Sequence, residues 1–207
     1  MSFLEIQIHT GWGWVLQSLV DWCQPQADWI TLDVGCGPGL LPALLSQREC
    51  LAFGVDLDEH MFSPSRLQSQ VAVADAIHLP FPDHIFHLIT ASNLLFLLAD
   101  SSLALREIVR LVRPEGLVVM LNPSEHMSVV AATTLADQRG LQGLDRDSLL
   151  NWAATAEANR RWGESELQEL FTETGLRMVD TSLKVGPGLA RFAKGVRTRI
   201  STQDDED

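Results

Sequence analysis

The feature that most limits how this chain can fold is a regular alternation of short apolar runs with segments of helical periodicity. Short apolar runs are typical of buried strands, and the helical segments between them supply the crossovers that parallel strands need. We therefore predict an α/β fold with a seven-stranded, mostly parallel sheet, helices on both of its faces and an antiparallel last strand. The expected strands are residues 29–34, 51–56, 71–74, 86–91, 116–122, 177–185 and 189–196.

Local signals place some of the connections between these strands. Between residues 100 and 114 apolar side chains recur at the i, i+3, i+4, i+7 spacing of a helix that lays one face on the sheet, and Pro114 should end that helix. A second helix is expected over residues 163–174. The Gly-Pro-Gly sequence at 186–188 favours a turn, so the last two strands should form an antiparallel hairpin that closes the sheet.

Two segments do not follow the alternation, and both are candidates for a helical lid over a binding site. Residues 2–23 are apolar and rich in Trp, and residues 124–160 insert helical sequence between the fifth strand and the next helix. We see no linker to a second domain, so residues 1–200 should form one domain that includes this lid. Residues 201–207 have too little apolar content to pack, and we expect a disordered acidic tail there.

Composition limits the partners and the compartment. The formal net charge of −12 would repel phosphate backbones, so we expect no nucleic-acid partner. The first Lys or Arg is Arg48, and no apolar run is long enough to span a bilayer, so the chain should be soluble and cytoplasmic, without a membrane partner. The three cysteines, Cys23, Cys36 and Cys50, match no metal-ligand spacing, and no metal site is expected.

The strongest local motif is an apolar strand that runs into three alternating glycines. These are Gly35, Gly37 and Gly39, and a helix is expected from Leu40 onward. Glycine lets the backbone approach a ligand closely, and the first turn of the helix offers unpaired N–H groups. A dinucleotide fingerprint would carry Gly or Ala at the position of Leu40, so the motif is a poor match to NAD. The loop could also be only a tight structural turn.

Acidic residues stand at the carboxyl ends of three of the expected strands. Asp33 precedes the glycine loop, where its carboxylate could accept loop N–H groups or meet a cationic group of a ligand. Asp56 ends the next strand, where an acid can accept both hydroxyls of a ribose, whereas Asp58 has the position of a helix N-cap. After the third strand, Asp75 could accept from an adenine amino group, while the N–H of Ala76 or of the next residue reaches a ring nitrogen.

Together these residues resemble the class I S-adenosylmethionine-dependent methyltransferases, particularly the type 11 group that includes the ubiquinone/menaquinone-biosynthesis methyltransferases. The resemblance runs from about Thr31 to Asn122, with the motifs in the family's order and spacing. Its most specific parts are Leu32-Asp33-Val34-Gly35-Cys36-Gly37-Pro38-Gly39, Asp75-Ala76-x-x-Leu79-Pro80-Phe81 and Leu105-Arg106-Glu107-Ile108-x-Arg110-Leu111-x-Arg113-Pro114-x-Gly116.

The resemblance implies a Rossmann-like fold, S-adenosylmethionine as cofactor and methyl transfer to a small-molecule acceptor. It places the methionine part of the cofactor at the glycine loop, the ribose at the end of the second strand and the adenine after the third. One further cofactor contact follows the fourth strand. The positions that match these motifs are Asp33, Gly35, Cys36, Gly37, Gly39, Asp56, Leu57, Asp75, Ala76 and Ser92.

The acceptor side has no comparable motif, because methyl transfer depends mainly on alignment and on the exclusion of water. A general base is needed only when the acceptor must lose a proton, and His126, just beyond the fifth strand, is our candidate for it. Each acceptor-side candidate could instead be an ordinary packing or surface residue. The candidates, chosen for their lid or strand-end positions, are His9, Trp12, Trp14, Asn93, Asn122, Glu125 and Trp152.

Three functions are compatible with these residues. The first is a small-molecule methyltransferase, the second a non-catalytic sensor or partner subunit that binds adenosylmethionine, and the third a nicotinamide-dependent oxidoreductase. Leu40 and the motif at Asp75 disfavour the third. The cofactor motifs suit either of the first two.

Overall fold

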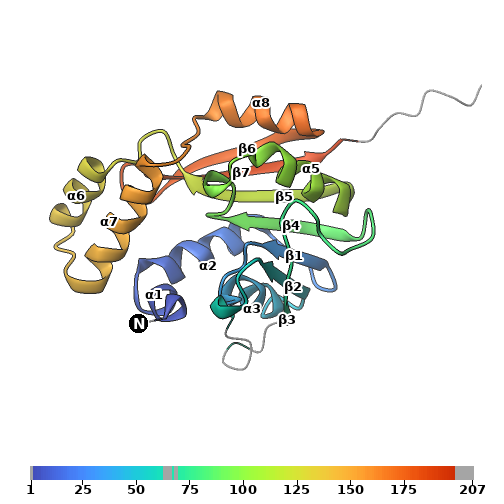
Figure 1. The fold of residues 1–207 in the computed structure, drawn as a ribbon, viewed down its shortest axis with the longest axis horizontal. Helices are drawn as coiled ribbons and strands as arrows, with labels where there is room; N and C mark the ends of the chain where they lie inside the picture. The colour runs from blue at the N-terminus through green and yellow to red at the C-terminus, as the bar shows by residue number, and fades with distance from the viewer. Residues whose placement is uncertain (1, 63–66, 68–69, 199–207) are drawn as a thin grey trace, which may run out of the picture.

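The computed structural model describes residues 2–62, 67 and 70–198, which form a seven-stranded sheet covered by helices, as predicted (Figure 1). The strand order is β3-β2-β1-β4-β5-β7-β6. Every pairing among β1 to β5 is parallel, and β7 runs antiparallel to both of its neighbours. The strands are β1 (Ile30–Val34), β2 (Leu51–Asp56), β3 (Gln70–Val73), β4 (Phe86–Ser92), β5 (Val112–Pro123), β6 (Leu176–Lys184) and β7 (Ala190–Arg197).

Helices cover both faces of this sheet. On one face α2 packs against α3, and on the other α5 packs against α8. Figure 1 shows α6 and α7 beyond the carboxyl ends of the parallel strands. The helices are α1 (Phe3–His9), α2 (Gly11–Cys23), α3 (Leu40–Ser46), α5 (Ser101–Leu111), α6 (Val129–Gln138), α7 (Gly143–Glu157) and α8 (Glu164–Thr174), with short 3₁₀ turns η1 (Glu59–Met61) and η2 (Leu95–Leu97).

The centre of the core follows the strands β1, β4 and β5. Leu32, Leu88 and Val119, one from each of these strands, are fully buried. Strands flanked on both edges and covered on both faces have no wet side, so they read as continuous apolar runs. This explains why the sequence could predict these strands well.

One helix ends earlier than predicted. The prediction that Pro114 ends α5 is wrong, because the helix stops at Leu111 and β5 already begins at Val112. Val112 has extended backbone angles, is fully buried and pairs with Phe86 of β4. Burial of Val112 in the sheet therefore ends the helix before the proline can act.

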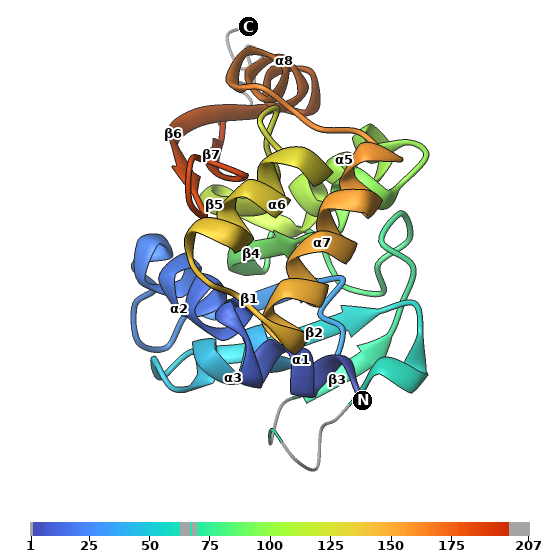
Figure 2. The same ribbon diagram turned by 90° about the vertical axis from the view of Figure 1, so that its left-hand side faces the viewer.

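The two segments expected to form a lid meet each other. Helix α1 lies against α7, and the backbone N–H of Gly11 donates to Asp145 Oδ1 at 3.2 Å (Figure 2). The rest of α2 belongs to the core, because Leu16, Leu19 and Val20 are buried. Of the N-terminal segment, therefore, only α1 and the first turn of α2 lie where a lid would be.

Two expectations from composition concern the C-terminal segment and membrane-spanning helices. The segment 201–207, expected to be a disordered tail, lies outside the described residues. In the part of the chain that the structure describes, no helix is both long and apolar enough to cross a membrane.

Candidate functional site

The glycine loop sits at the carboxyl end of β1 and is anchored to β2. The N–H groups of Gly35 and Cys36 both donate to the carbonyl of Val55, at 2.8 and 2.9 Å. Gly35 has a φ of +73°, and a Cβ there would lie 3.0 Å from the side chain of Leu94. Backbone conformation and close packing both require glycine at this position.

A buried carboxyl group lies directly before the loop. Asp33 is 2% exposed, and its Oδ1 accepts a hydrogen bond from the hydroxyl of Thr90 at 2.7 Å. Burial raises the pKa of Asp33 from 3.8 to about 8; the Thr90 hydrogen bond lowers this pKa, and the charge of Asp56 raises it. A cation placed beside Asp33 would favour its ionised form, so this carboxyl is suited to a positively charged ligand group.

Asp56, at the end of β2, holds the loop from the other side. Its Oδ2 accepts from the N–H of Gly37 at 2.8 Å, and its Oδ1 accepts from the N–H of Asp58 at 3.1 Å. An ionised carboxylate has about four acceptor positions, so two remain for ligand hydroxyls. Asp58 caps the short 3₁₀ turn η1 by accepting from the N–H of His60 at 3.0 Å, which confirms its predicted capping role.

These groups open into a cavity of about 520 Å³ between the carboxyl edge of the sheet, α1, the start of α2 and α7. Its wall carries three acidic side chains, Asp33, Asp56 and Asp58. The side-chain oxygen of Gln7, also on the wall, is buried and has no hydrogen-bond partner among the described residues. Aromatic and aliphatic side chains on the same wall include Phe3, Ile6, Trp12, Leu16, Leu94, Phe96, Leu97 and Trp152.

This arrangement fits S-adenosylmethionine. The cofactor carries positive charge, ribose hydroxyls and an ammonium group, and the cavity offers two carboxylates and an unpaired amide oxygen as acceptors. Cavities of a few hundred Å³ are the usual size for ligands of this kind. Among the described residues, no group of three or more His, Cys, Asp or Glu could hold a metal ion.

Comparison with known proteins identifies the family. Residues 32–120, which contain the glycine loop, Asp56 and strand β4, match the family model described as "Methyltransferase domain". Residues 32–120 therefore form a methyltransferase domain of the class I S-adenosylmethionine-dependent type. Its cofactor is S-adenosylmethionine.

Two curated relatives and one solved structure show how far the likeness extends. The methyltransferase is 28% identical over 155 residues to a demethylmenaquinone methyltransferase of Corynebacterium kroppenstedtii, covering 72% of this chain and 68% of that protein. It is 30% identical over 137 residues to the protein of the same name from Mycobacterium marinum, covering 63% and 59%. The magnesium protoporphyrin IX methyltransferase of Synechocystis PCC 6803, solved with bound S-adenosylhomocysteine, superposes with a TM-score of 0.68 at 17% identity, covering 96% and 89%. At that identity the last comparison shows the shared fold.

The structure brings most of the predicted cofactor residues of the methyltransferase to one cavity. Those on its wall are Asp33, Gly35, Cys36, Gly37, Asp56 and Ser92. Gly39 lies behind the wall as the N-cap of α3, and Leu57 is exposed. Asp75 and Ala76 do not line the cavity; Asp75 Oδ1 accepts from the N–H of Ile77 at 3.1 Å. Contact of Asp75 with adenine therefore stays a prediction.

The structure places part of the expected acceptor side away from the cavity. A second cavity lies beside this one, and His126 lines neither of them. About half of its side chain is exposed, and its Nε2 lies 3.6 Å from Glu125 Oε1. Glu125 itself accepts from Arg191 at 2.7 Å. His9 is exposed on α1, and Asn122 is buried within β5. The geometry thus gives no support to His126 as a base, or to His9, Asn122 and Glu125 as pocket residues.

The other acceptor-side candidates do line cavities. Trp12, Asn93 and Trp152 lie on the wall of the cofactor cavity, and Trp14 lies on the wall of the neighbouring one. The indole N–H of Trp152 donates to Asn93 Oδ1 at 3.1 Å, which links α7 to the end of β4. These four residues remain candidates for the acceptor side.

Several wall residues were missed from the sequence, although a signal was present. Ser148, Asn151, Trp152 and Thr155 follow the i, i+3, i+4, i+7 spacing and form one stripe of α7 facing the cavity. Phe3, Ile6 and Gln7 repeat the first part of that spacing on α1. In a lid helix, a stripe that mixes polar and aromatic side chains indicates that this face of the helix meets a hydrated cavity rather than the apolar core.

The raised pKa of Asp33 makes a prediction about stability. The folded protein keeps this carboxyl protonated below about pH 8, whereas the unfolded chain releases the proton above about pH 4. Stability from Asp33 is therefore fully present below pH 4 and is lost as the pH rises toward 8. Between pH 5.5 and 8.5 we expect wild type to lose about 2 to 3 kcal/mol relative to Asp33→Asn, measured by urea unfolding without cofactor.

An exposed acid of the lid provides the matched control for this measurement. Asp147 lies exposed on α7, so Asp147→Asn removes the same charge without removing a buried titrating group. Its stability should follow the wild-type pH profile. Parallel profiles for wild type and Asp33→Asn would show that Asp33 is already ionised in the folded protein.

Proposed function

We propose that this methyltransferase transfers the methyl group of S-adenosylmethionine to a small, partly apolar or aromatic acceptor. The observation that carries the proposal is the composition of the cofactor cavity, which is lined by both acidic side chains and a set of aromatic and aliphatic side chains. Such a cavity can hold a charged cofactor beside the reacting end of an apolar acceptor and limit the access of water. The net charge of −12 further supports a small-molecule acceptor rather than a nucleic acid.

The residues of the chain would contribute mainly by binding and orientation. Bound S-adenosylmethionine supplies a methyl carbon that forms a bond to a lone pair of the acceptor as its bond to sulfur breaks, with that electron pair left on sulfur. Asp33 would balance the positive charge of the cofactor, and Asp56 would accept its ribose hydroxyls. Trp12 and Trp152 would keep water from the acceptor, and alignment of this kind contributes a large share of the rate in reactions between two bound molecules.

The cavity wall also limits the kind of nucleophile. Among the described wall residues there is no His, Lys or Glu, and the titrating groups are Asp33, Cys36, Asp56 and Asp58 at the cofactor end. Burial raises the pKa of the Cys36 thiol, which keeps it from acting as a thiolate base. An acceptor atom that already carries an available lone pair at neutral pH suits this wall, because it needs no protein base.

A labelling experiment tests the proposal. The protein is incubated with methyl-labelled S-adenosylmethionine and a fractionated metabolite extract, and labelled small molecules are sought by mass spectrometry. We expect a labelled product with wild type and none with Asp33→Asn. Tight cofactor binding without a labelled product in any fraction would contradict the proposal and favour a binding role.

The two neighbouring acids after β2 should behave differently. Asp56→Ala removes an acceptor from the ribose and the anchor of Gly37, so we expect cofactor affinity to fall about ten- to a hundredfold. Asp58→Ala should mainly lower stability, by roughly 1 kcal/mol, because it removes the cap of η1. Calorimetric titration with S-adenosylhomocysteine and thermal unfolding of both variants test this ranking. A larger affinity loss for Asp58→Ala would reverse the assignment of the two carboxylates.

A further inference from the structure

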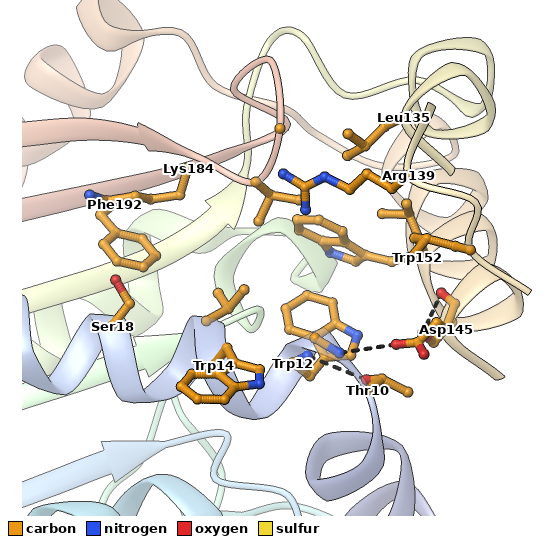
Figure 3. A pocket seen from close by; sticks show the side chains of 17 residues that line it. Thr10, Trp12, Trp14, Ser18, Leu135, Arg139, Asp145, Trp152, Lys184 and Phe192 are labelled. Carbon is orange, nitrogen blue, oxygen red and sulfur yellow. Dashed lines mark hydrogen bonds between the residues drawn. The ribbon is translucent and has the colours of Figure 1, made fainter. Parts of the chain in front are cut away.

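A second cavity of about 460 Å³ lies beside the cofactor cavity (Figure 3). Its wall is formed by α2, α6, α7 and the turn between β6 and β7. The cofactor motifs contribute no residue to it. Its function must therefore be read from its own chemistry.

The two cavities share one wall. Trp12, Ser148 and Trp152 line both of them. The rings of Trp12 and Trp152 meet edge to face, with centroids 4.7 Å apart and an interplanar angle of 74°. The hydrogen bond from Trp152 to Asn93 holds this wall against the end of β4. The two cavities are therefore adjacent, and Trp12, Ser148 and Trp152 lie where they meet.

Two cations lie on the wall of the second cavity without an acidic partner. Within the described residues, neither Arg139, the C-cap of α6, nor Lys184 of β6 forms an ion pair. Figure 3 shows the Arg139 side chain extending toward the middle of the cavity, above the rings of Trp12 and Trp152. Lys184 Nζ lies 5.5 Å from the ring centre of Phe192, so its charge stays close to the apolar wall.

Within the described residues, the acid on the same wall, Asp145, forms no ion pair with either cation. Asp145 Oδ1 accepts from the backbone N–H of Gly11 at 3.2 Å, which ties α7 to the start of α2. Elsewhere in this acidic chain, cations of the same lid and sheet are paired: Arg146 with Asp137 at 2.6 Å, and Arg191 with Glu125 at 2.7 Å. Arg139 and Lys184 are therefore available to an anionic ligand.

The fold brings the two cations to one cavity through a close backbone contact. Gly186 of the β6–β7 turn has a φ of +58°, and a Cβ there would lie 2.6 Å from the side chain of Leu135 on α6. Only glycine lets the turn pack this closely against α6. As a result Lys184, two residues before Gly186, lines the same cavity as Arg139, one turn after Leu135.

The rest of the wall is apolar, and part of it is uncovered. Trp14 is 81% exposed at the cavity, which is unusual for so large an apolar side chain. Val15, Leu141, Leu149 and Phe192 provide further apolar surface. Together with the apolar lining of the hollow, the exposed ring of Trp14 offers surface on which an apolar ligand could pack.

We propose that the second cavity binds the acceptor of the methyltransferase, and that this acceptor is an amphipathic monoanion. Its carboxylate pairs with Arg139, the charge of Lys184 adds to the positive potential of the wall, and its apolar or aromatic body lies on Trp14 and Phe192. Its methyl-accepting end reaches into the cofactor cavity past Trp12, Ser148 and Trp152, the residues that line both cavities. A single carboxylate suits the fork of an Arg on a mostly apolar wall. This inference rests on the proposed methyl-transfer function and adds the charge and shape of its substrate.

A pair of compounds that differ in charge tests this proposal. 1-Naphthylacetate and 1-naphthylacetamide have the same ring and nearly the same shape, but only the first is an anion. Each is titrated into the protein saturated with S-adenosylhomocysteine, by calorimetry at two salt concentrations. We expect the acetate to bind at least about fivefold more tightly at low salt, with a smaller difference at high salt, because the cations are partly exposed. Equal affinity for the two compounds, or binding of neither, would overturn the proposal.

Variants locate the selectivity at these two side chains. Arg139→Gln should remove most of the preference for the acetate and Lys184→Gln a smaller part of it, and both should leave affinity for the acetamide unchanged. Arg146→Gln removes the same charge from a position of α7 that lines neither cavity, and it should keep the wild-type preference. Trp14→Ala should weaken both compounds equally. An unchanged preference in Arg139→Gln and Lys184→Gln would show that the anion binds elsewhere.

The same titrations separate this proposal from the proposed function. Affinity for S-adenosylhomocysteine is measured in every variant and should not change with Arg139→Gln or Lys184→Gln, because neither residue lines the cofactor cavity. Failure of wild type to bind S-adenosylmethionine and S-adenosylhomocysteine would contradict the methyl-transfer function. The preference for 1-naphthylacetate over 1-naphthylacetamide is measured independently of cofactor binding, so its absence would contradict only the proposal for the second cavity.

Discussion

Replacing Asp33 by Asn is expected to lower the affinity for S-adenosylmethionine by about thirtyfold to a thousandfold or more. Asn keeps the shape of the side chain and can still accept from Thr90, but it removes the negative charge next to a cationic ligand. Loss of one member of a buried charge pair costs about 2 to 5 kcal/mol, which gives this range of affinity. Isothermal titration calorimetry with S-adenosylmethionine and S-adenosylhomocysteine measures the effect.

A proton count provides an independent control for this variant. Near pH 7 the Asp33 carboxyl of the cofactor-free protein is protonated, because burial raises its pKa to about 8. Binding of a cation should release that proton, so the binding enthalpy of wild type should depend on the ionisation enthalpy of the buffer. We expect the dependence to be absent in Asp33→Asn and retained in Asp147→Asn. Wild-type affinity in Asp33→Asn would show that Asp33 does not face the charge of the cofactor.

The second large effect is expected from removal of residues 2–13. This deletion takes away α1 and the first turn of α2, and with them Phe3, Ile6, Gln7 and Trp12 from the cavity wall. We expect affinity for S-adenosylhomocysteine to fall at least about tenfold, since burial of one large apolar side chain contributes about 1.5 to 3 kcal/mol. Methyl transfer should be lost, because the cavity would open to water.

The deleted protein should still fold. Leu16, Leu19 and Val20, which join α2 to the main core, remain in place. Circular dichroism and thermal unfolding measure the fold, and loss of a cooperative transition would mean that α1 belongs to the core rather than to a lid. Trp12→Ala and Ile8→Ala are milder variants for the same question, since Ile8 lies on α1 but lines neither cavity. Affinity should fall only in Trp12→Ala, and equal affinities would remove Trp12 from the cofactor wall.

Asp33 shows how function can cost stability in this protein. The same burial that suits the carboxyl to a cationic ligand raises the free energy of its ionised form when no ligand is present. The predicted gain in stability of Asp33→Asn at high pH and its predicted loss of affinity therefore have one cause. Such a trade-off between stability and ligand affinity is typical of binding sites, where a group that pairs with the ligand is left unpaired in the ligand-free protein.

The cofactor side of the site could be predicted from the sequence because its residues follow local rules. Gly35 is required by a positive φ and by a close neighbour, and both requirements arise where a strand turns into a helix. Asp56 and Asp58 could be told apart because an N-cap has a fixed place relative to its helical turn. Asp33 could be placed next to the loop, but the burial that raises its pKa, its hydrogen bond with Thr90 and its proximity to the charge of Asp56 all depend on the packing of other strands.

The acceptor side could not be predicted in the same way, because its residues come together only through packing of distant segments. His126 and Trp152 both belong to the inserted segment 124–160, yet only Trp152 lies on the face of α7 that meets the cavity. Asn122 lies one residue before the end of β5, much as Asp56 ends β2, but Asn122 is buried within the fold. The period of a helix or strand shows which residues share a face, but not which face meets a cavity.

By itself, then, the sequence determined the seven strands, the glycine loop, the acids at the strand ends and thereby the family and its cofactor. These depend on periodicity, turn chemistry and short spacings, which are properties of neighbouring residues. Only the tertiary structure decided that α2 is mostly core, that the two lid segments meet at Trp12 and Trp152, and that Arg139 and Lys184 line one cavity. Those facts depend on contacts between residues far apart in the chain, and such contacts are fixed only when the whole core packs.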